Sequence, residues 1–488
     1  MSASVVTVSG EARTFPGKVF FDGVKAAFAA GARPVTMFGG ASKDPAHLKL
    51  TAVLDLGGAL EVWRTGIPRD TGYHALSSDI PAFHMFEREL AEQHHITPHG
   101  HPWLKPVRYP GAKQADASAH PFYPITGHQV HEVAVGPIHA GVIEPGHFRF
   151  MCTGETVQHL EIQLGYQHRG VEALLPARNP WTVTPLVETI AGDSSVAHAW
   201  AHAAAVEALV ARPVTAEAEL SRAVGLELER VAMHLAGLSA LAGDVAFLQG
   251  ASSYGRLRTT AINTSMALCG SRFGRGWMRP GGVRAGWTRE QGAAVKKNLA
   301  LLRRDTAIMD GRLLESTGVE HRLQGVGTVT RAQALQVGLV GLPARACGVE
   351  LDLRVRHGGG AFAARAVNLV THPDGDCWAR AVVRVREIAE SLRWLDDVFA
   401  ATPELVPGVM EPAPLAPETL VVSAVEGWRG EVIHALETDS QGRVVTHKVQ
   451  DPSLVNWFGL ALAVRNNEIS DFPICNKSFD LSYCGNDL

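Results

Sequence analysis

Three long stretches with helical periodicity constrain the fold more than any other feature of the sequence. The clearest is TAEAELSRAVGLELERVAMHLAGLSALAGDVAFLQG, residues 215–250, and residues 289–316 and 376–400 repeat the pattern. Apolar side chains recur three and four positions apart, so each helix presents one apolar stripe that must be buried against another element. We therefore predict that the larger part of the chain is a helical bundle.

Strand-like segments accompany these helices. Residues 128–141 and 146–165 read as two strands joined by a tight corner at 144–147, and residues 419–453 read as a meander with glycine-containing turns. These segments predict small antiparallel sheets attached to the helices, in one domain that spans residues 127–488.

The first part of the chain has a different character. Residues 49–67 alternate as strands do, and residues 80–96 form an amphipathic helical pattern. We predict a small mixed α/β domain over residues 1–118, a linker over 119–126 and, for the whole chain, the α+β fold class.

Composition excludes several classes of protein. The formal net charge of -4 provides no basic face for nucleic acid. The longest apolar runs are about 11 residues, whereas a transmembrane helix needs roughly 20, and no secretory signal is visible at the N-terminus. The six cysteines are scattered singly, which argues against a zinc or iron–sulfur site made by cysteine pairs. The sequence predicts a cytoplasmic chain with no membrane span of its own.

Four clusters could carry chemistry: residues 136–150, 164–172, 188–198 and 344–354. Each combines glycine or proline with side chains that pair charge or move protons. His139 and His147 are either turn histidines bonded to backbone or proton carriers, and Glu144 is either a solvated turn carboxylate or part of the site. The segment ETIAGDSSVAH, residues 188–198, has the short side-chain oxygens that are typical of a helix N-cap.

Taken together and in order, these motifs resemble those of a known family. GPIHAGVIEPGHFRF, LGYQHRGVE, ELERVAMHLAGLSALAGDVAF, GTVTRAQALQVGLVGLPARACGVELDLR and EGWRGEVIHAL are similar to segments of the large subunit of the membrane-bound [NiFe]-hydrogenase and complex I superfamily. The hydrogenase-4 and formate hydrogenlyase type is the most similar group. MFERELAEQHHITPHGHPWLKP resembles the complex I 30 kDa subunit, which that group carries fused at its N-terminus.

The sequence departs from this family where the metal ligands belong. In the metal-bearing members, two Cys-x-x-Cys pairs supply thiolates to nickel and iron. The resemblance assigns the first pair to Ala191 and Ser194 and the second to Ser482 and Gly485. Alanine and glycine offer no donor and a neutral serine hydroxyl is a poor one, so we expect the metal centre to be lost.

Complex I members lack the metal as well and use the cavity for a quinone head group. His147 corresponds to a quinone-contacting histidine of that family, whereas Ile190 stands where its tyrosine would be. The resemblance therefore implies a polar cavity that handles protons or a quinone. We expect His147, Asp193, His198 and Glu144 to act in catalysis there. The expected cofactor-binding residues are His139, Glu188, Ser194 and Ser195. The alternative to a reactive cavity is that Asp193, Ser194 and Ser195 only replace the metal ligands with hydrogen bonds and a helix cap.

The function that the resemblance implies is that of a metal-free large subunit in a membrane-associated oxidoreductase. Its partners would be a small iron–sulfur subunit, which carries the clusters, and antiporter-like membrane subunits. The chain would lie peripherally on the cytoplasmic side of the membrane. Two alternatives remain: a catalytically silent adaptor between those partners, and a true hydrogenase with unusual ligands.

Overall fold

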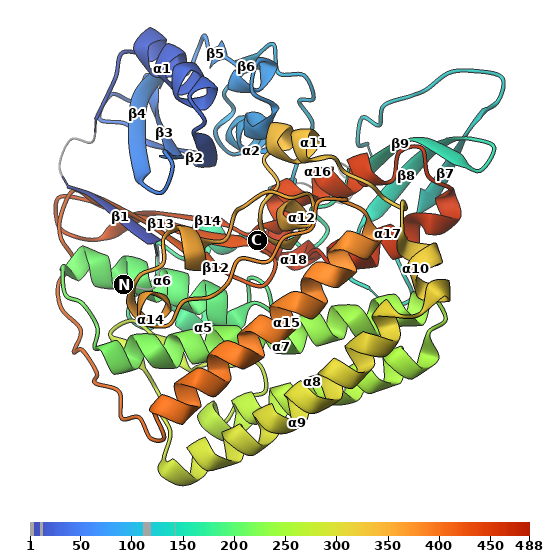
Figure 1. Ribbon diagram of the computed structural model, residues 1–488. Coiled ribbons are helices and arrows are strands. Elements are labelled where there is room, and N and C mark those ends of the chain that lie inside the picture. The colour runs from blue at the N-terminus through green and yellow to red at the C-terminus, as the bar shows by residue number, and fades with distance from the viewer. Residues whose placement is uncertain (1–3, 10–12, 111–118, 142) are drawn as a thin grey trace.

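The computed structural model describes residues 4–9, 13–110, 119–141 and 143–488 (Figure 1). It confirms the predicted α+β class, with a small mixed unit at the N-terminus above a larger, mainly helical body. The predicted boundary at residue 118 falls at the edge of residues 111–118, which lie outside the described residues. None of the helices in the described part of the chain has the length and apolarity needed to cross a bilayer.

The N-terminal unit is a three-stranded antiparallel sheet covered by two helices. Its strands, in the order β2-β3-β4, are β2 (Arg33–Ala41), β3 (His47–Asp55) and β4 (Leu60–Pro68). Helix α1 (Gly17–Ala29) packs on β4 and α2 (His84–His94) on β2. A short parallel pair follows, β5 (Tyr73–His74) with β6 (Pro98–His99). Buried side chains of the N-terminal unit, such as Phe20 and Leu90, belong to the same hydrophobic core as Phe148 and Trp457 of the larger body. The two parts therefore pack against each other.

Four long helices form a bundle. They are α7 (Ala216–Asp244), α8 (Leu248–Cys269), α9 (Arg289–Leu314) and α15 (Cys377–Ala401), and they lie together on the side of the body remote from the N-terminal unit (Figure 1). Three of them, α7, α9 and α15, follow the predicted periodic stretches, whereas α8 was not predicted. Local chemistry fixes three of their starts. The side chains of Thr215, Thr288 and Asp376 accept the backbone N–H of the third residue beyond each cap.

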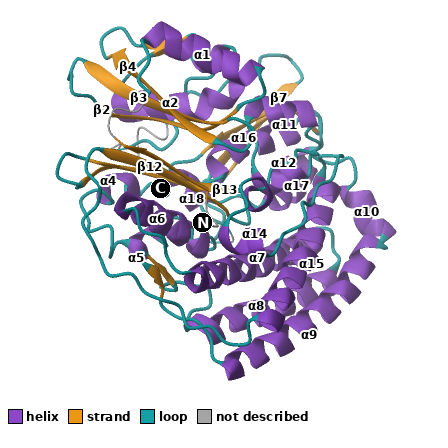
Figure 2. Ribbon diagram, turned by 60° about the vertical axis from the view of Figure 1, so that its left-hand side comes forward, coloured by secondary structure: helices purple, strands orange, loops and turns teal. Residues whose placement is uncertain are grey.

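A four-stranded antiparallel sheet lies between the bundle side and the N-terminal unit (Figures 1 and 2). Its order is β1-β12-β13-β14, with β1 (Ser4–Ser9), β12 (Thr419–Glu426), β13 (Glu431–Thr438) and β14 (Val444–Gln450). Helix α6 (Ser195–Val210) packs against β12 and β13. Every residue of β12 and β13 is buried, because protein covers both faces. The sequence did not predict that β1 pairs with the C-terminal meander.

The remaining elements surround this core. One antiparallel sheet contains β7 (Val130–Val135), β8 (His147–Thr153) and β9 (Thr156–Gln163), so the predicted strand over 146–165 is two strands with a turn at Gly154. A two-stranded ribbon pairs β10 (Met278–Arg279) with β11 (Gly282–Val283). The shorter helices are α4 (Val171–Leu174), α5 (Thr184–Val187), α10 (Thr317–Leu323), α11 (Arg331–Val337), α12 (Gly341–Arg345), α13 (Leu353–Arg356), α14 (Gly360–Ala364), α16 (Ser453–Ala463), α17 (Phe472–Phe479) and α18 (Tyr483–Asp487).

The last residues of the chain lie inside the molecule. Leu488 is buried, and its carbonyl accepts the backbone N–H groups of Arg169 and Gly170 at 2.9 and 3.1 Å. Figure 1 shows this end beside α18 and the four-stranded sheet. The segment thereby brings Ser482 and Gly485 next to residues that precede α6.

Candidate functional site

Of the four positions assigned to cysteines, Gly485 lies directly against Asp451. Ala191 and Ser194 lie in the turn before α6, and Ser482 and Gly485 lie at the start of α18. A Cβ added to Gly485 would meet the Asp451 carboxylate at 2.6 Å. The same carboxylate lies 3.1 Å from Nε2 of His198. Asp451 thus occupies the space that a side chain at 485 would need and links both halves of the site.

Arg429, which is buried, forms an ion pair with the partly exposed Asp193. Its Nη1 and Nη2 donate to the two carboxylate oxygens of Asp193 at 2.6 and 2.7 Å, and its Nε donates to the carbonyl of Asp480. The guanidinium lies over the ring of Trp428, whose Nε1 donates to the Asp193 carbonyl at 2.9 Å. Burial lowers the pKa of Arg429, but the charge and hydrogen bonds of Asp193, together with the charges of Asp480 and Asp451, outweigh burial and the pKa is raised. The pair is a fixed, bidentate clamp.

The Cys484 thiol lies beside both ion pairs. Its backbone N–H donates to Glu144 at 3.3 Å, and its sulfur is 3.4 Å from the hydroxyl of Ser482. Burial raises the pKa of Cys484 to about 11, and the negative charges of Glu144, Asp193 and Asp451 add to this effect. Cys484 is therefore a neutral thiol at pH 7, and a neutral thiol is neither a nucleophile nor a good metal ligand.

The cap of α6 differs from the prediction. Ser194 occupies the N-cap position, but its side chain accepts no capping hydrogen bond in the part of the chain that the structure describes. Instead the carboxylate of Glu229, on α7, accepts the N–H groups of Val196 and Ala197 at 2.8 and 3.3 Å. The interpretation of 188–198 as a self-capping segment is wrong, because a neighbouring helix supplies the acceptor.

Glu229 has the most perturbed carboxyl group near Asp193. Burial raises the pKa of Glu229 to about 8, and the charge of Asp193 adds to this effect. Both residues line a small cavity of about 10 Å³, together with Ser265 and Arg272, which is room for about one water molecule. Glu229 can therefore hold a proton near neutral pH and exchange it with a neighbouring carboxylate or water.

The predicted residues of the β7–β8 connection differ in what they contact. Glu144 contacts α18 through Cys484, and His139 bonds to the carbonyl of Gly146 at 2.8 Å. His147 bonds through Nδ1 to the carbonyl of Gly136 at 3.2 Å. Its Nε2 is buried and has no hydrogen-bond partner among the described residues. Burial lowers the pKa of His147, so this imidazole is neutral at pH 7.

Glu188 and Ser195 point elsewhere. Glu188 accepts the N–H of Gly276 at 2.6 Å, and burial raises its pKa. Ser195 donates to the carbonyl of Gly192 at 3.1 Å and accepts from Arg275 at 3.4 Å. These contacts hold the loop at 271–277 against the start of α6. Of the eight predicted residues, Asp193, Ser194 and His198 thus contact the ion pairs directly, and Glu144 reaches them through Cys484.

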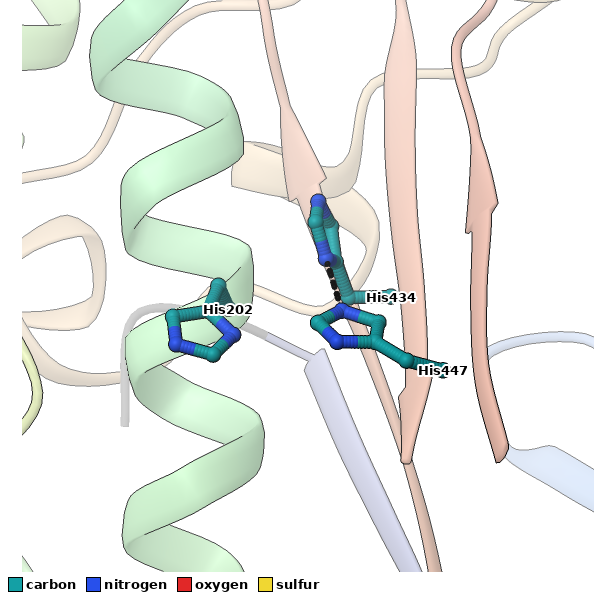
Figure 3. A group of neighbouring side chains, drawn as sticks. All are labelled: His202, His434 and His447. Carbon is teal, nitrogen blue, oxygen red and sulfur yellow. Dashed lines mark hydrogen bonds between the residues drawn. The ribbon is translucent and has the colours of Figure 1, made fainter. Parts of the chain in front are cut away.

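Arg429, Asp451 and Glu229 were not predicted from the sequence as site residues. Arg429 lies in EGWRGEVIHAL, a motif used only for the resemblance. Three further buried histidines, His202, His434 and His447, were not predicted either (Figure 3), and His434 lies 3.2 Å from His198. The signal was present, because His198 and His202 are four residues apart on one helix face, and His434 and His447 are on adjacent predicted strands.

Comparison with known proteins agrees with this architecture. The model of the family "Respiratory-chain NADH dehydrogenase, 49 Kd subunit" matches residues 244–414. Hydrogenase-4 component G of Escherichia coli is 27% identical over 90% of this chain and 80% of its own length. Formate hydrogenlyase subunit 5 of the same organism is 27% identical over 84% of this chain and 76% of its own. The chain is a homologue of the hydrogenase and complex I large subunits. The resemblance inferred from the motifs is thereby confirmed.

A solved structure confirms the fold of this homologue. A chain of the membrane-bound sulfane sulfur reductase, an archaeal respiratory membrane complex, superposes with a TM-score of 0.70 at 22% identity. The match covers 75% of this chain and 100% of the other. The protein is thus similar in sequence to hydrogenase and complex I large subunits and shares the fold of the reductase chain.

The residues present do not fit a nickel–iron centre. The four assigned positions offer a methyl group, two hydroxyls and a hydrogen atom. The Ser482 hydroxyl accepts the N–H of Gly485 at 2.9 Å, and Arg429 donates to Ser194 at 3.5 Å. The soft thiolates that such a centre requires are not offered at these positions.

Replacing Glu229 with Gln is expected to change how stability depends on pH. The folded pKa of about 8 exceeds the unfolded value of about 4.5, so the folded protein binds the extra proton between those values. The associated stability is complete below about pH 4.5 and is lost as the pH rises toward 8, with a slope of up to about 1.4 kcal/mol per pH unit. Melting the wild type and Glu229→Gln from pH 5 to 8 should show this loss only in the wild type. Parallel curves for the two proteins would contradict it.

Proposed function

We propose that this chain is the large subunit of a membrane-associated, hydrogenase-4- or complex I-like oxidoreductase, that it holds no nickel–iron centre, and that its site handles protons. The single observation that carries this proposal is the Arg429–Asp193 pair beside Glu229. A carboxyl group with a pKa of about 8 next to a fixed carboxylate can load and release a proton at neutral pH.

The proposed reaction role follows from how charge acts in this site. An electron that arrives on a neighbouring iron–sulfur cluster adds negative charge, and added negative charge favours protonation of a nearby carboxylate. Glu229 and Asp193 would take up that proton. Arg429 holds the Asp193 carboxylate in one geometry, and Asp451 and His198 form a second buried pair alongside it. The site would thus couple electron arrival to proton movement.

A quinone head group is the second candidate ligand, and one observation favours it. Nε2 of His147 is buried and has no hydrogen-bond partner within the described residues, as expected of a group that hydrogen-bonds to a ligand when the ligand is bound. Against it, Ile190 is fully buried among apolar neighbours that include Val187 and Leu488. It supplies no hydroxyl for a second contact.

The partners follow from the relatives. Their names describe subunits of hydrogenase, formate hydrogenlyase and NADH–quinone oxidoreductase systems. We propose a small iron–sulfur subunit and antiporter-like membrane subunits as partners, with this chain peripheral on the cytoplasmic side of the membrane. The iron–sulfur clusters would belong to the partners, since among the described residues no three cysteines come together and only the sulfurs of Cys377 and Cys475, 4.0 Å apart, form a close pair.

Electron transfer by the intact complex tests the proton-handling role. Asp193→Asn and Glu229→Gln should each lower the rate about tenfold to a hundredfold, as expected for loss of a positioned proton carrier, and should change its pH profile. His147→Ala should lower the rate further only if a quinone binds. Asp439→Asn, in an exposed turn, is the matched control. If all variants assemble and turn over like the wild type, the chain is a structural adaptor.

A further inference from the structure

Three histidines from three different elements meet in the interior, outside the ion pairs described above. His202 comes from α6, His434 from β13 and His447 from β14 (Figure 3). One ring nitrogen of each lies within 4.8 Å of the others. His434 Nδ1 and His447 Nε2 are 2.9 Å apart. We propose that His202, His434 and His447 form a zinc site.

Hydrogen bonding fixes which ring nitrogen of His202 is available to bind a metal ion. Its Nε2 lies 2.9 Å from the carbonyl of Pro180, and a carbonyl only accepts, so this nitrogen carries the proton. Nδ1 therefore has a free lone pair. It is buried, has no hydrogen-bond partner in the described ranges, and belongs to a fully buried side chain. In Figure 3 one nitrogen of His202 faces the other two rings. An unsatisfied buried acceptor costs about 1–3 kcal/mol, and a metal ion would satisfy it.

A chain of hydrogen bonds from Asp451 through His198 orients His434. Asp451 accepts from Nε2 of His198 at 3.1 Å, which leaves Nδ1 of His198 as an acceptor. Nδ1 of His198 lies 3.2 Å from Nε2 of His434, so that nitrogen of His434 carries the proton. The lone pair of His434 is then on Nδ1, which faces His447. Metal-binding histidines usually donate their other N–H to a carbonyl, or to a carboxylate directly or through a relay. His202 and His434 follow this pattern.

The ligand set selects the metal. An imidazole binds a metal in its neutral form, through the lone pair of one ring nitrogen. Three imidazoles without a thiolate suit tetrahedral Zn²⁺ with a fourth position left for water. Zinc–nitrogen bonds of about 2.0–2.1 Å at tetrahedral angles separate ligand nitrogens by roughly 3.3 Å. His434 and His447 need move apart by only a few tenths of an ångström.

The site goes beyond the proton-handling role proposed above. The Asp451–His198–His434 contacts run from the proton-handling site to the three histidines. A zinc ion there would fix β13 and β14 to α6 and hold the Asp451 carboxylate in place through His198. Binding of zinc does not require turnover, so the two proposals can fail separately.

Zinc titration of the full-length chain after removal of metals tests the proposal. The wild type should take up about one zinc per chain, and His202→Gln should bind at least about 100-fold more weakly, because even loss of an outer-shell partner costs 10–100-fold. His84→Gln is the matched control, since His84 is also buried with an unpartnered ring nitrogen but stands apart from the cluster. It should bind like the wild type. Equal zinc binding by His202→Gln, or none by the wild type, would overturn the site.

Zinc X-ray absorption on the wild type avoids reliance on a variant that fails to fold. The expected first shell contains three imidazole nitrogens at about 2.0–2.1 Å and one oxygen ligand at about 2.0–2.2 Å. Sulfur at about 2.3 Å would place the ion at cysteines and overturn the assignment.

Discussion

Replacing Arg345 with Met is expected to lower the free energy of unfolding by about 3–5 kcal/mol, the usual effect of breaking a buried ion pair from one side. Arg345 is fully buried on α12. It donates to Glu387 at 2.7 Å and to Glu426 at 2.6 Å, and to the carbonyl of Leu351 at 3.0 Å. Burial opposes ionisation of Glu387, yet Arg345 and the hydrogen bond from His234 hold its pKa well below the ordinary range. Met would leave two buried carboxylates without their main countercharge.

Denaturant unfolding of the wild type and Arg345→Met measures this loss. Arg289→Met is the matched control, because Arg289 makes an exposed ion pair with Glu404 at 3.2 Å and exposed pairs contribute about 0–1 kcal/mol. The double variant Arg345→Met/Glu387→Gln should recover part of the loss by removing one uncompensated charge. An Arg345→Met midpoint equal to that of Arg289→Met would contradict the account of this network.

Replacing Arg429 with Met should destabilise the protein by about 2–3 kcal/mol, less than the change at Arg345. The Asp193 side chain is 38% exposed, so water can solvate its carboxylate once the guanidinium is gone. The contact with the Asp480 carbonyl and the packing over Trp428 are lost as well.

A double-mutant cycle isolates the pair. Asp193→Asn alone, Arg429→Met alone and the combination should give a coupling free energy of about 1–2 kcal/mol, within the range of residues in contact. Lys18→Met with Asp22→Asn is the surface control, whose side chains are 87% and 60% exposed, and its coupling should be near zero. Additive losses at Arg429 and Asp193 would show that the clamp stabilises neither the turn before α6 nor α18.

Sequence patterns predicted the helices because their signal is local. The period of residues 216–244 and the Thr215 cap together specify α7. The pairing of β1 with β12 was not predictable in this way, since Ser4 and Ala424 are partners across almost the whole chain. The same distance hides Asp451, whose carboxylate meets Gly485 and His198 only after α6, β14 and α18 have packed.

The site was predicted in part for the same reason. Family motifs directed attention to residues 188–198, and Asp193 and His198 do contact the buried ion pairs. Composition also suggested that Ser194 would cap its own helix, but Glu229 does so from a neighbouring helix. Local sequence preference indicates that the N-terminus of the helix needs a capping acceptor. Local sequence preference does not identify the residue that supplies this acceptor.

Nickel analysis of the isolated complex tests the central claim most directly. We predict nickel well below one atom per chain, because the ion pairs of Arg429 and Asp451 take the place of thiolate ligands. The measurement should be made on the wild type and on His202→Gln, so that nickel bound by the histidine cluster is recognised by its loss. About one nickel per chain in both proteins would contradict the account.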